Sequence, residues 1–344
     1  LNPSLGFGRA YVAGQLEVVG GFQAFLRGVF SLGGSVWGRT PLQRGNWLLH
    51  RLRGESKTTR AEHNARFHYD QGNEFFRLWL DPSMTYSCAY FRTETDDLAT
   101  AQQQKLELLC RKLDLQKDQT LLDVGCGWGS LLFHAIEHHG VRGTGITPSR
   151  EQASYIEAEI KRRGLGDRFT LHMADWRTIR GAYDRVVSVG MYEHVGKEHG
   201  REFFSKWAEW LKPEGVSLLH TIGGMESLPP DPWITENIFP GGYLPALSEL
   251  ATHAATAGLI VTDVENLWRH YALTLAAWAK NYAAARDAIV QRSGEQFYRR
   301  WWLYLNASEA VFAAGRMLLW QLVLTKGKRV NQPLTRESWI LSAD

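Results

Sequence analysis

Three glycines at alternate positions follow a short apolar segment of the sequence. The segment 120–124 contains Asp123, and Gly125, Gly127 and Gly129 come directly after it. An apolar run that ends near an acid and turns through glycines is typical of a buried strand leading tightly into a helix. Because glycine has no Cβ and adopts positive φ, such a turn lets the backbone approach a ligand at the next helix's N-terminus. The pattern therefore predicts a ligand-binding loop.

The surroundings of these glycines indicate which ligand. A dinucleotide site has the pattern G-x-G-x-x-G and an acid about 20 residues further on, at the end of the second strand. Here the glycines run G-x-G-x-G, and the second apolar run, 141–146, is followed by Thr147 with no acid before Glu151. Asp123 suits a ligand with an amine or another cationic group near the strand end, as in S-adenosylmethionine. A glycine-rich turn without a ligand is the alternative.

Composition and charge exclude some classes of protein. Of 344 residues, 44% are hydrophobic and 22% are charged, which is ordinary for a globular chain. The 14 Trp and 15 Phe suit a large apolar cavity, an interfacial surface or an aromatic-rich core. A formal net charge of +3 is too small to indicate nucleic acid but is compatible with an anionic membrane surface. No apolar run reaches the roughly 18 residues that a membrane span needs.

The cysteines indicate neither a disulfide framework nor a metal site. Cys88, Cys110 and Cys126 are odd in number and lack the spacing of zinc ligands. A reducing, cytoplasmic compartment is therefore expected. The sequence also begins at Leu1 without a methionine, so we expect further residues upstream.

Strand and helix patterns alternate through the middle of the chain. A helix with leucines on one face is expected at 98–113. Strands are expected at 120–124, 141–146, 169–173, 185–189, 216–221 and 259–264, and the helices between them begin at or near 130, 149 and 202. Repeated βα units predict a parallel, doubly wound sheet, in which ligands bind outside the carboxyl ends of the strands. Those ends carry Asp123, Thr147, Asp175-Trp176, residues 190–196 and residues 220–222.

Different patterns flank this region. Residues 1–60 are expected to form a small accessory segment, with a strand at 11–19 and a helix at 22–30, ending in a basic linker around 51–60. The remainder, 61–344, predicts the catalytic domain. Its Pro- and Gly-rich stretch at 223–245 is long enough to be a lid or entrance. Two helices are expected at 271–290 and 296–322, the second with an aromatic face.

Further motifs accompany the glycine-rich loop in a fixed order. They are His68-Tyr69-Asp70, Tyr86-Ser87-Cys88-Ala89-Tyr90, residues 188–196 (Ser-Val-Gly-Met-Tyr-Glu-His-Val-Gly), Leu219-His220-Thr221-Ile222-Gly223 and Ile238-Phe239-Pro240-Gly241. With the loop, they resemble the cyclopropane-fatty-acyl-phospholipid synthases and the mycolic acid cyclopropane synthases over residues 6–327. The resemblance implies a class I S-adenosylmethionine-dependent methyltransferase, α/β and Rossmann-like, with a seven-stranded sheet and a small N-terminal accessory domain.

The resemblance also implies a reaction. In that family the methyl group of S-adenosylmethionine is transferred to a cis double bond of an acyl chain, and the resulting carbocation loses a proton so that a cyclopropane ring closes. A bound bicarbonate ion serves as the base. Its cradle corresponds here to the backbone of Cys88 and Ile222 and the side chains of Glu193, His220 and Tyr271. The residues implied around S-adenosylmethionine are Tyr86, Ser87, Asp123, Gly125, Gly127, Thr147, Gln152 and Trp176.

The implied partner is unsaturated phospholipid at the inner face of a membrane, bound peripherally, with a homodimer as the assembly. Arg9 departs from the family, whose members tend to carry an acid there. Three alternatives remain open from the sequence: a related transfer giving a methylene or methyl-branched chain, methylation of a small molecule, and a non-catalytic lipid-binding protein on the same fold.

Overall fold

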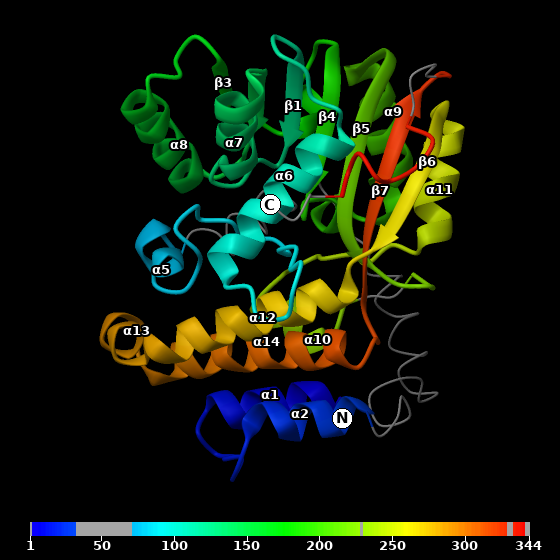
Figure 1. The fold of residues 1–344 in the computed structure, drawn as a ribbon. Coiled ribbons are helices and arrows are strands. Elements are labelled where there is room, and N and C mark those ends of the chain that lie inside the picture. The colour runs from blue at the N-terminus through cyan, green and yellow to red at the C-terminus, as the bar shows by residue number, and fades with distance from the viewer. Residues whose placement is uncertain (1, 32–70, 228–229, 329–332, 341–344) are drawn as a thin grey trace.

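The computed structural model describes residues 2–31, 71–227, 230–328 and 333–340. Its centre is one seven-stranded sheet with the strand order β3-β2-β1-β4-β5-β7-β6 (Figure 1). The strands are β1 (Thr120–Val124), β2 (Arg142–Ile146), β3 (Phe169–His172), β4 (Tyr183–Val189), β5 (Leu211–Gly223), β6 (Leu259–Asn266) and β7 (Leu318–Lys326). Strands β1 to β5 pair in parallel, whereas β7 runs antiparallel to both of its neighbours.

The described helices fall into a sheet-covering set and a set at one end of the sheet. The first set is α6 (Leu98–Lys112), α7 (Ser130–His139), α8 (Arg150–Arg163), α9 (Gly200–Trp210) and α11 (Leu247–Thr256). The second set is α1 (Pro3–Val12), α2 (Phe22–Ser31), α5 (Asn73–Arg77), α10 (Pro232–Asn237), α12 (Trp268–Ala284), α13 (Arg286–Ser293) and α14 (Glu295–Ala313). Short 3-10 turns lie at Trp176–Thr178, Tyr192–His194 and Lys197–His199.

Both faces of the sheet are buried, which explains the continuous apolar runs of its strands. Leu121 belongs to a core cluster with α6 and α7, whereas Leu122 belongs to a second cluster with α9 and α11. Leu218 and Leu219 of β5 alternate between the same two clusters, because successive side chains of a strand point to opposite faces. The expected doubly wound sheet is therefore confirmed.

A third, aromatic cluster lies at the carboxyl end of the parallel strands. β6 runs parallel to β5, since both are antiparallel to β7, so α12 begins at the same edge where β5 ends. Figure 1 shows α12, α13 and α14 across this end of the sheet, with α1 and α2 on the far side of that layer. Trp79, Trp278, Trp301 and Phe312 are buried there. Many of the aromatic residues thus form a third core, the aromatic layer.

Two sequence predictions about the C-terminal region were wrong. The helix expected at 271–290 is two helices, α12 and α13, which meet at Ala285. The helix expected at 296–322 ends at Ala313, Gly315 adopts a φ of +64°, and residues from Leu318 onward form β7. An apolar run such as Leu318–Leu324 fits a buried helix and a buried strand equally well, so periodicity could not separate them. The segment forms a strand because the edge of β5 offers backbone hydrogen-bonding partners to it.

The strand expected at 11–19 is also absent, since Tyr11 and Val12 complete α1. Pro3 stands in the first turn of that helix, and the Asn2 side chain accepts hydrogen bonds from the backbone N–H groups of Ser4 and Leu5. The helix expected at 22–30 is confirmed as α2. The expected boundary at residue 60 and the basic linker lie outside the described residues, as do His68-Tyr69-Asp70.

The N-terminal helices pack on α14 and α10. Arg27 forms an ion pair with the buried Glu309 of α14, and Arg9 pairs with Glu236 of α10 at 2.8 Å between Nη2 and Oε2. Gly8 lies against Trp233, where an added Cβ would come within 2.2 Å of the indole. The pairing of Arg9 with Glu236 accounts locally for the basic residue at position 9.

The stretch 223–245 is packed against the protein over much of its described length. Trp233 and Ile238 are buried, and the Tyr243 backbone N–H donates to the Glu193 carbonyl at 2.9 Å. A role as lid stays a prediction. None of the helices in the described ranges is long and apolar enough to cross a membrane.

Candidate active site

The glycine-rich loop joins β1 to α7 beside the end of β2. The backbone N–H groups of Gly125 and Cys126 both donate to the Ile146 carbonyl, at 3.1 and 2.9 Å. Gly125, Gly127 and Gly129 all have positive φ, between 57° and 85°. A Cβ on Gly125 would come within 2.6 Å of Met191, whereas one on Gly127 would meet no atom within 4 Å. The loop therefore packs against Met191 at Gly125 and borders open space at Gly127.

The open side of the loop borders a pocket at the carboxyl ends of β1, β2 and β4. All eight residues predicted around S-adenosylmethionine line this pocket: Tyr86, Ser87, Asp123, Gly125, Gly127, Thr147, Gln152 and Trp176. Segments that lie up to 90 residues apart in the chain thus meet at one place, as expected for the switch point of such a sheet. Their assignment to a cofactor stays a prediction that this convergence supports.

The pocket contains a buried acid and a buried base. Burial raises the pKa of Asp123 to about 7 against the opposing charge of Lys105, and Asp123 Oδ1 has no hydrogen-bond partner among the described residues. Burial lowers the pKa of Lys105 to about 8, and its ammonium donates to Ser87 Oγ at 3.0 Å. An unpaired buried carboxyl oxygen is costly, so a cationic or hydrogen-donating ligand would stabilise this arrangement.

Hydrogen bonds position several pocket side chains. The Thr147 hydroxyl donates to Gln152 Oε1 at 2.6 Å, and Ser149 caps α8 at the Gln152 backbone. The Tyr86 hydroxyl lies 2.8 Å from that of Tyr304 on α14. These contacts link the pocket wall both to the sheet and to the aromatic layer.

A second polar cluster lies beside the pocket, where β4 and β5 end. Glu193 is buried in the 3-10 turn that follows β4, between the pocket residues Met191 and His194. Its Oε1 accepts from the Ile222 backbone N–H at 2.6 Å, and its Oε2 has no partner in the described chain. Burial raises the pKa of Glu193 to about 7, although the hydrogen bond from Ile222 opposes this shift. Glu193 is thus largely protonated below neutral pH.

His220 of β5 is held neutral in a defined tautomer. The Lys112 ammonium donates to Gln321 Oε1, which orients the amide so that Gln321 Nε2 lies 3.1 Å from His220 Nδ1 as a donor. Nδ1 is then the acceptor, and Nε2 carries the proton. Burial, with the charges of Lys105 and Lys112, lowers the pKa of His220 to about 3. His220 Nε2 has no partner among the residues described.

Cys88 and Tyr271 lie in the aromatic layer. Cys88 is buried, its Sγ lies 4.0 Å from the Thr274 hydroxyl of α12, and burial raises the pKa of its thiol well above the usual range. Tyr271 stands one turn earlier on α12 and packs against the cluster that contains Cys88, with its ring 4.7 Å from that of Phe312. A protonated thiol is a poor nucleophile, and the role of the Cys88 backbone stays a prediction.

The structure brings Glu193 into hydrogen-bond contact with the Ile222 backbone and places His220 on the same strand as Ile222. Cys88 lies against Thr274 of α12, the helix that also carries Tyr271. Sequence reasoning missed Gln321, Lys112 and Lys105. Gln321 lies in the segment that was assigned to a helix, where a single amide within Leu318–Leu324 was the available signal. Lys105 and Lys112 lie on α6 among leucines, and both are buried.

Comparison with solved structures defines the class of protein. The fold is similar to mycolic acid cyclopropane synthase CmaA1 complexed with SAH and CTAB, with a TM-score of 0.74 and 36% identity over 77% of this chain and 98% of that one. It is equally similar to coclaurine N-methyltransferase, with a TM-score of 0.74 and 23% identity over 94% and 99% of the two chains, which at that identity shows the fold alone. The protein is an S-adenosylmethionine-dependent methyltransferase by fold.

Comparison of sequences then gives the family. Residues 56–322 match the family described as mycolic acid cyclopropane synthetase, and the chain belongs to it. The chain is 40% identical to the cyclopropane-fatty-acyl-phospholipid synthase of Escherichia coli (strain K12) over 261 residues, which is 76% of this chain and 67% of that protein. It is 36% identical to a probable fatty acid methyltransferase of Pseudomonas putida over 330 residues, which is 93% and 82% of the two proteins.

Proposed function

We propose that this enzyme uses S-adenosylmethionine to convert cis double bonds of phospholipid-bound unsaturated acyl chains into cyclopropane rings. The observation that carries the proposal is a pair of buried atoms without partners, Glu193 Oε2 and His220 Nε2, beside a pocket lined by a glycine loop. Methylation at a neutral oxygen or nitrogen also releases a proton, but from a heteroatom that water or a single general base can deprotonate. Addition to an alkene requires a second site of this kind, because the product cation must lose a proton from carbon after the transfer.

S-adenosylmethionine would supply an electrophilic methyl group, and the pocket residues suit its charges. Asp123 and Lys105 offer one acidic and one basic group to the zwitterionic methionine end. Gly127 leaves room for close approach of the ligand to the backbone. Thr147 and Gln152 provide neutral hydroxyl and amide groups at the end of β2, where a dinucleotide site would carry an acid.

The second cluster suits a small oxyanion. Bicarbonate bound there would supply a base that, unlike a fixed carboxylate, cannot remain attached to the protein if the cation alkylates it. His220 offers an Nε2–H donor without positive charge, and protonated Glu193 offers a donor from Oε2. Glu193 must share or keep its proton beside an anion, which its raised pKa favours. Tyr271 and the backbone at Cys88 would complete the proposed cradle. The Ile222 N–H donates to Glu193, so Ile222 would contribute its carbonyl as an acceptor for the bicarbonate hydroxyl.

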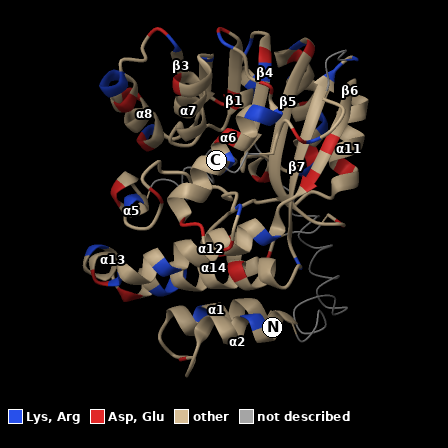
Figure 2. Cartoon of the chain, viewed as in Figure 1, with Lys and Arg blue, Asp and Glu red and all other residues tan. Residues whose placement is uncertain are grey.

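The acyl chain would lie along the aromatic layer. In that layer the ring of Tyr271 packs against those of Trp278 and Phe312, with centroids 6.1 and 4.7 Å away. The relative from Escherichia coli is named for a phospholipid substrate, which supports an acyl chain already in a lipid. Figure 2 shows Lys and Arg interspersed with Asp and Glu over the helices, consistent with a net charge of only +3.

The experiment is a reaction of the protein with cis-unsaturated phospholipid vesicles and S-adenosylmethionine labelled in its methyl group. The proposal predicts labelled lipid whose acyl chain contains a cyclopropane ring, identified by NMR and fragmentation mass spectrometry. Lipid without label would contradict it. Co-sedimentation with the vesicles, which should rise with their anionic lipid content, tests the proposed peripheral binding at a membrane, and light scattering tests the proposed homodimer.

A second candidate is methyl transfer that ends in a methylene or methyl-branched chain. The match to a probable fatty acid methyltransferase, which covers 93% of this chain at 36% identity, favours it. Both reactions share the cation and differ in which proton leaves. The same NMR spectra separate them, because a ring methylene, an exocyclic methylene and a branch methyl have different proton signals.

A further inference from the structure

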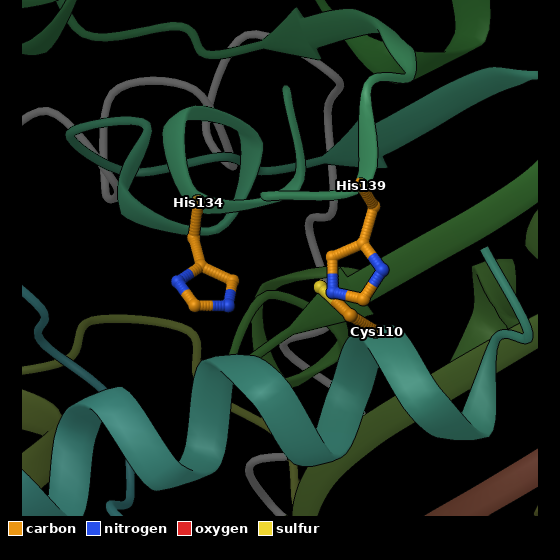
Figure 3. Close-up of side chains that lie close together, drawn as sticks. All are labelled: Cys110, His134 and His139. Atoms are coloured by element: carbon orange, nitrogen blue, oxygen red, sulfur yellow. The ribbon is translucent and has the colours of Figure 1, made fainter. Parts of the chain in front are cut away.

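One group of metal-ligating side chains lies away from the pocket and the cradle. Cys110 of α6 and His134 and His139 of α7 each direct one ligand atom to a common point, and these three atoms lie within 4.8 Å of one another (Figure 3). Glu107, one turn before Cys110 on α6, lies within hydrogen-bonding distance of both imidazoles. Nothing in the proposed reaction uses any of these four side chains.

The carboxylate of Glu107 lies between the two imidazoles at distances close to those between ligands of one metal ion. Its Oε2 lies 3.1 Å from His134 Nε2 and 3.0 Å from His139 Nε2. Two ligands on a tetrahedral zinc ion with bonds of 2.0–2.1 Å are separated by roughly 3.3 Å, so the distance from Glu107 Oε2 to each imidazole nitrogen is near that between two ligands. Glu107 Oε1 accepts from Arg111 Nε at 2.9 Å, which leaves Oε2 for the two imidazoles.

The fourth ligand would be the Cys110 thiolate. Cys110 is fully buried, whereas the side chains of His139 and Glu107 are 20% and 26% exposed. A cation could therefore enter past the imidazole and the carboxylate and reach the sulfur from outside. A site with thiolate, imidazole and carboxylate ligands suits a borderline-soft divalent ion of the zinc class rather than calcium or magnesium.

We propose that Cys110, His134, His139 and Glu107 bind one divalent transition-metal ion, of which zinc is the best match, between α6 and α7. Binding replaces the thiol proton, which goes to solvent, and leaves each imidazole protonated only at Nδ1. Both helices reach the pocket, through Lys105 of α6 and Ser130 of α7. The ion would link two walls of the pocket and stabilise the fold without entering the reaction.

The test is calorimetric titration of the full, tag-free, metal-stripped chain with Zn²⁺ in a non-chelating reductant. The proposal predicts one equivalent bound with a Kd below about 1 µM and a rise in the unfolding temperature. Co²⁺ should give a thiolate-to-metal charge-transfer band in the near ultraviolet. His139→Gln should weaken binding by more than the about 10- to 100-fold that loss of an outer-shell partner costs.

His138→Gln is the matched control. His138 stands next to His139 on α7 and lies against His134, with the two rings tilted and their centroids 4.5 Å apart, but it is not among the converging ligands. It should bind Zn²⁺ like the parent. Cys110→Ser should abolish the cobalt charge-transfer band even if it retains weak binding. Absence of Zn²⁺ binding by the parent, or equal binding by the parent, His139→Gln and Cys110→Ser, would overturn the proposal.

Discussion

The pocket at the end of β1 and the cluster at the end of β5 lie along the same edge of one sheet, but they handle charge differently. The pocket contains Asp123 and Lys105, whose shifted pKa values, about 7 and about 8, reflect the cost of burial. The cluster presents a neutral imidazole and a carboxyl group with a pKa of about 7. The pocket therefore suits a ligand carrying charge, whereas the cluster can accept an anion only while its own groups stay neutral.

This comparison predicts that the two sites can be impaired separately. Glu193→Gln keeps an acceptor for the Ile222 N–H but cannot share a proton with an anion. We expect turnover to fall roughly 10²- to 10⁴-fold, the usual contribution of acid–base catalysis, while the Kd for S-adenosylmethionine measured by calorimetry stays that of the parent. Full activity of this variant would refute the bicarbonate cradle.

The same substitution should change how stability depends on pH. The pKa of Glu193 is raised from 4.5 to about 7 in the folded protein, a difference of roughly 3 kcal/mol at most. The folded state then binds more protons than the unfolded state between these values, so the free energy of unfolding of the parent falls as the pH rises from 4.5 to 7. Denaturant unfolding should show that the free energy of unfolding of Glu193→Gln rises relative to that of the parent between pH 5 and pH 8. A constant difference would show that Glu193 is ionised in the fold.

Asp123→Asn addresses the other site. Loss of a charged hydrogen-bond acceptor costs about 1.5–3 kcal/mol, or about 10- to 100-fold in affinity for S-adenosylmethionine. Calorimetry should show this loss in Asp123→Asn and not in Glu193→Gln. If both variants bound the cofactor equally well, the division between a pocket for a charged ligand and a cluster for an anion would fail.

Gln321→Glu should give the smallest effect. A carboxylate at this position would accept a hydrogen bond from Nδ1–H of His220, which favours the tautomer with its proton on Nδ1 and leaves Nε2 without one. Turnover should fall about tenfold, below the range expected for a direct acid or base. Nitrogen NMR shifts of His220 should report the exchanged tautomer. Unchanged shifts would mean that Gln321 does not control the imidazole.

The metal-ligand group shows why some sites escape sequence analysis. The cysteines lack zinc-type spacing, which gave no reason to expect a metal site. The proposed ligands come from two helices, with Glu107 and Cys110 on α6 and His134 and His139 on α7. Their convergence depends on how α6 packs against α7 on the sheet, and no local pattern encodes that contact.

Tyr86, Ser87 and Gln152 were expected in the pocket from the family resemblance. The patterns of the sequence by themselves determined the glycine-rich loop, the order of βα units through β5 and the strand-end residues of the pocket. Each of these depends on contiguous patterns or on the rule that parallel strands end at one edge. Only the tertiary structure decided that Leu318–Lys326 is a strand between β5 and β6, because that segment's apolar run fits either conformation. Pairing of β7 with β5 in turn places Gln321 opposite His220. The proton on His220 therefore follows from strand register, which is a property of the packed sheet.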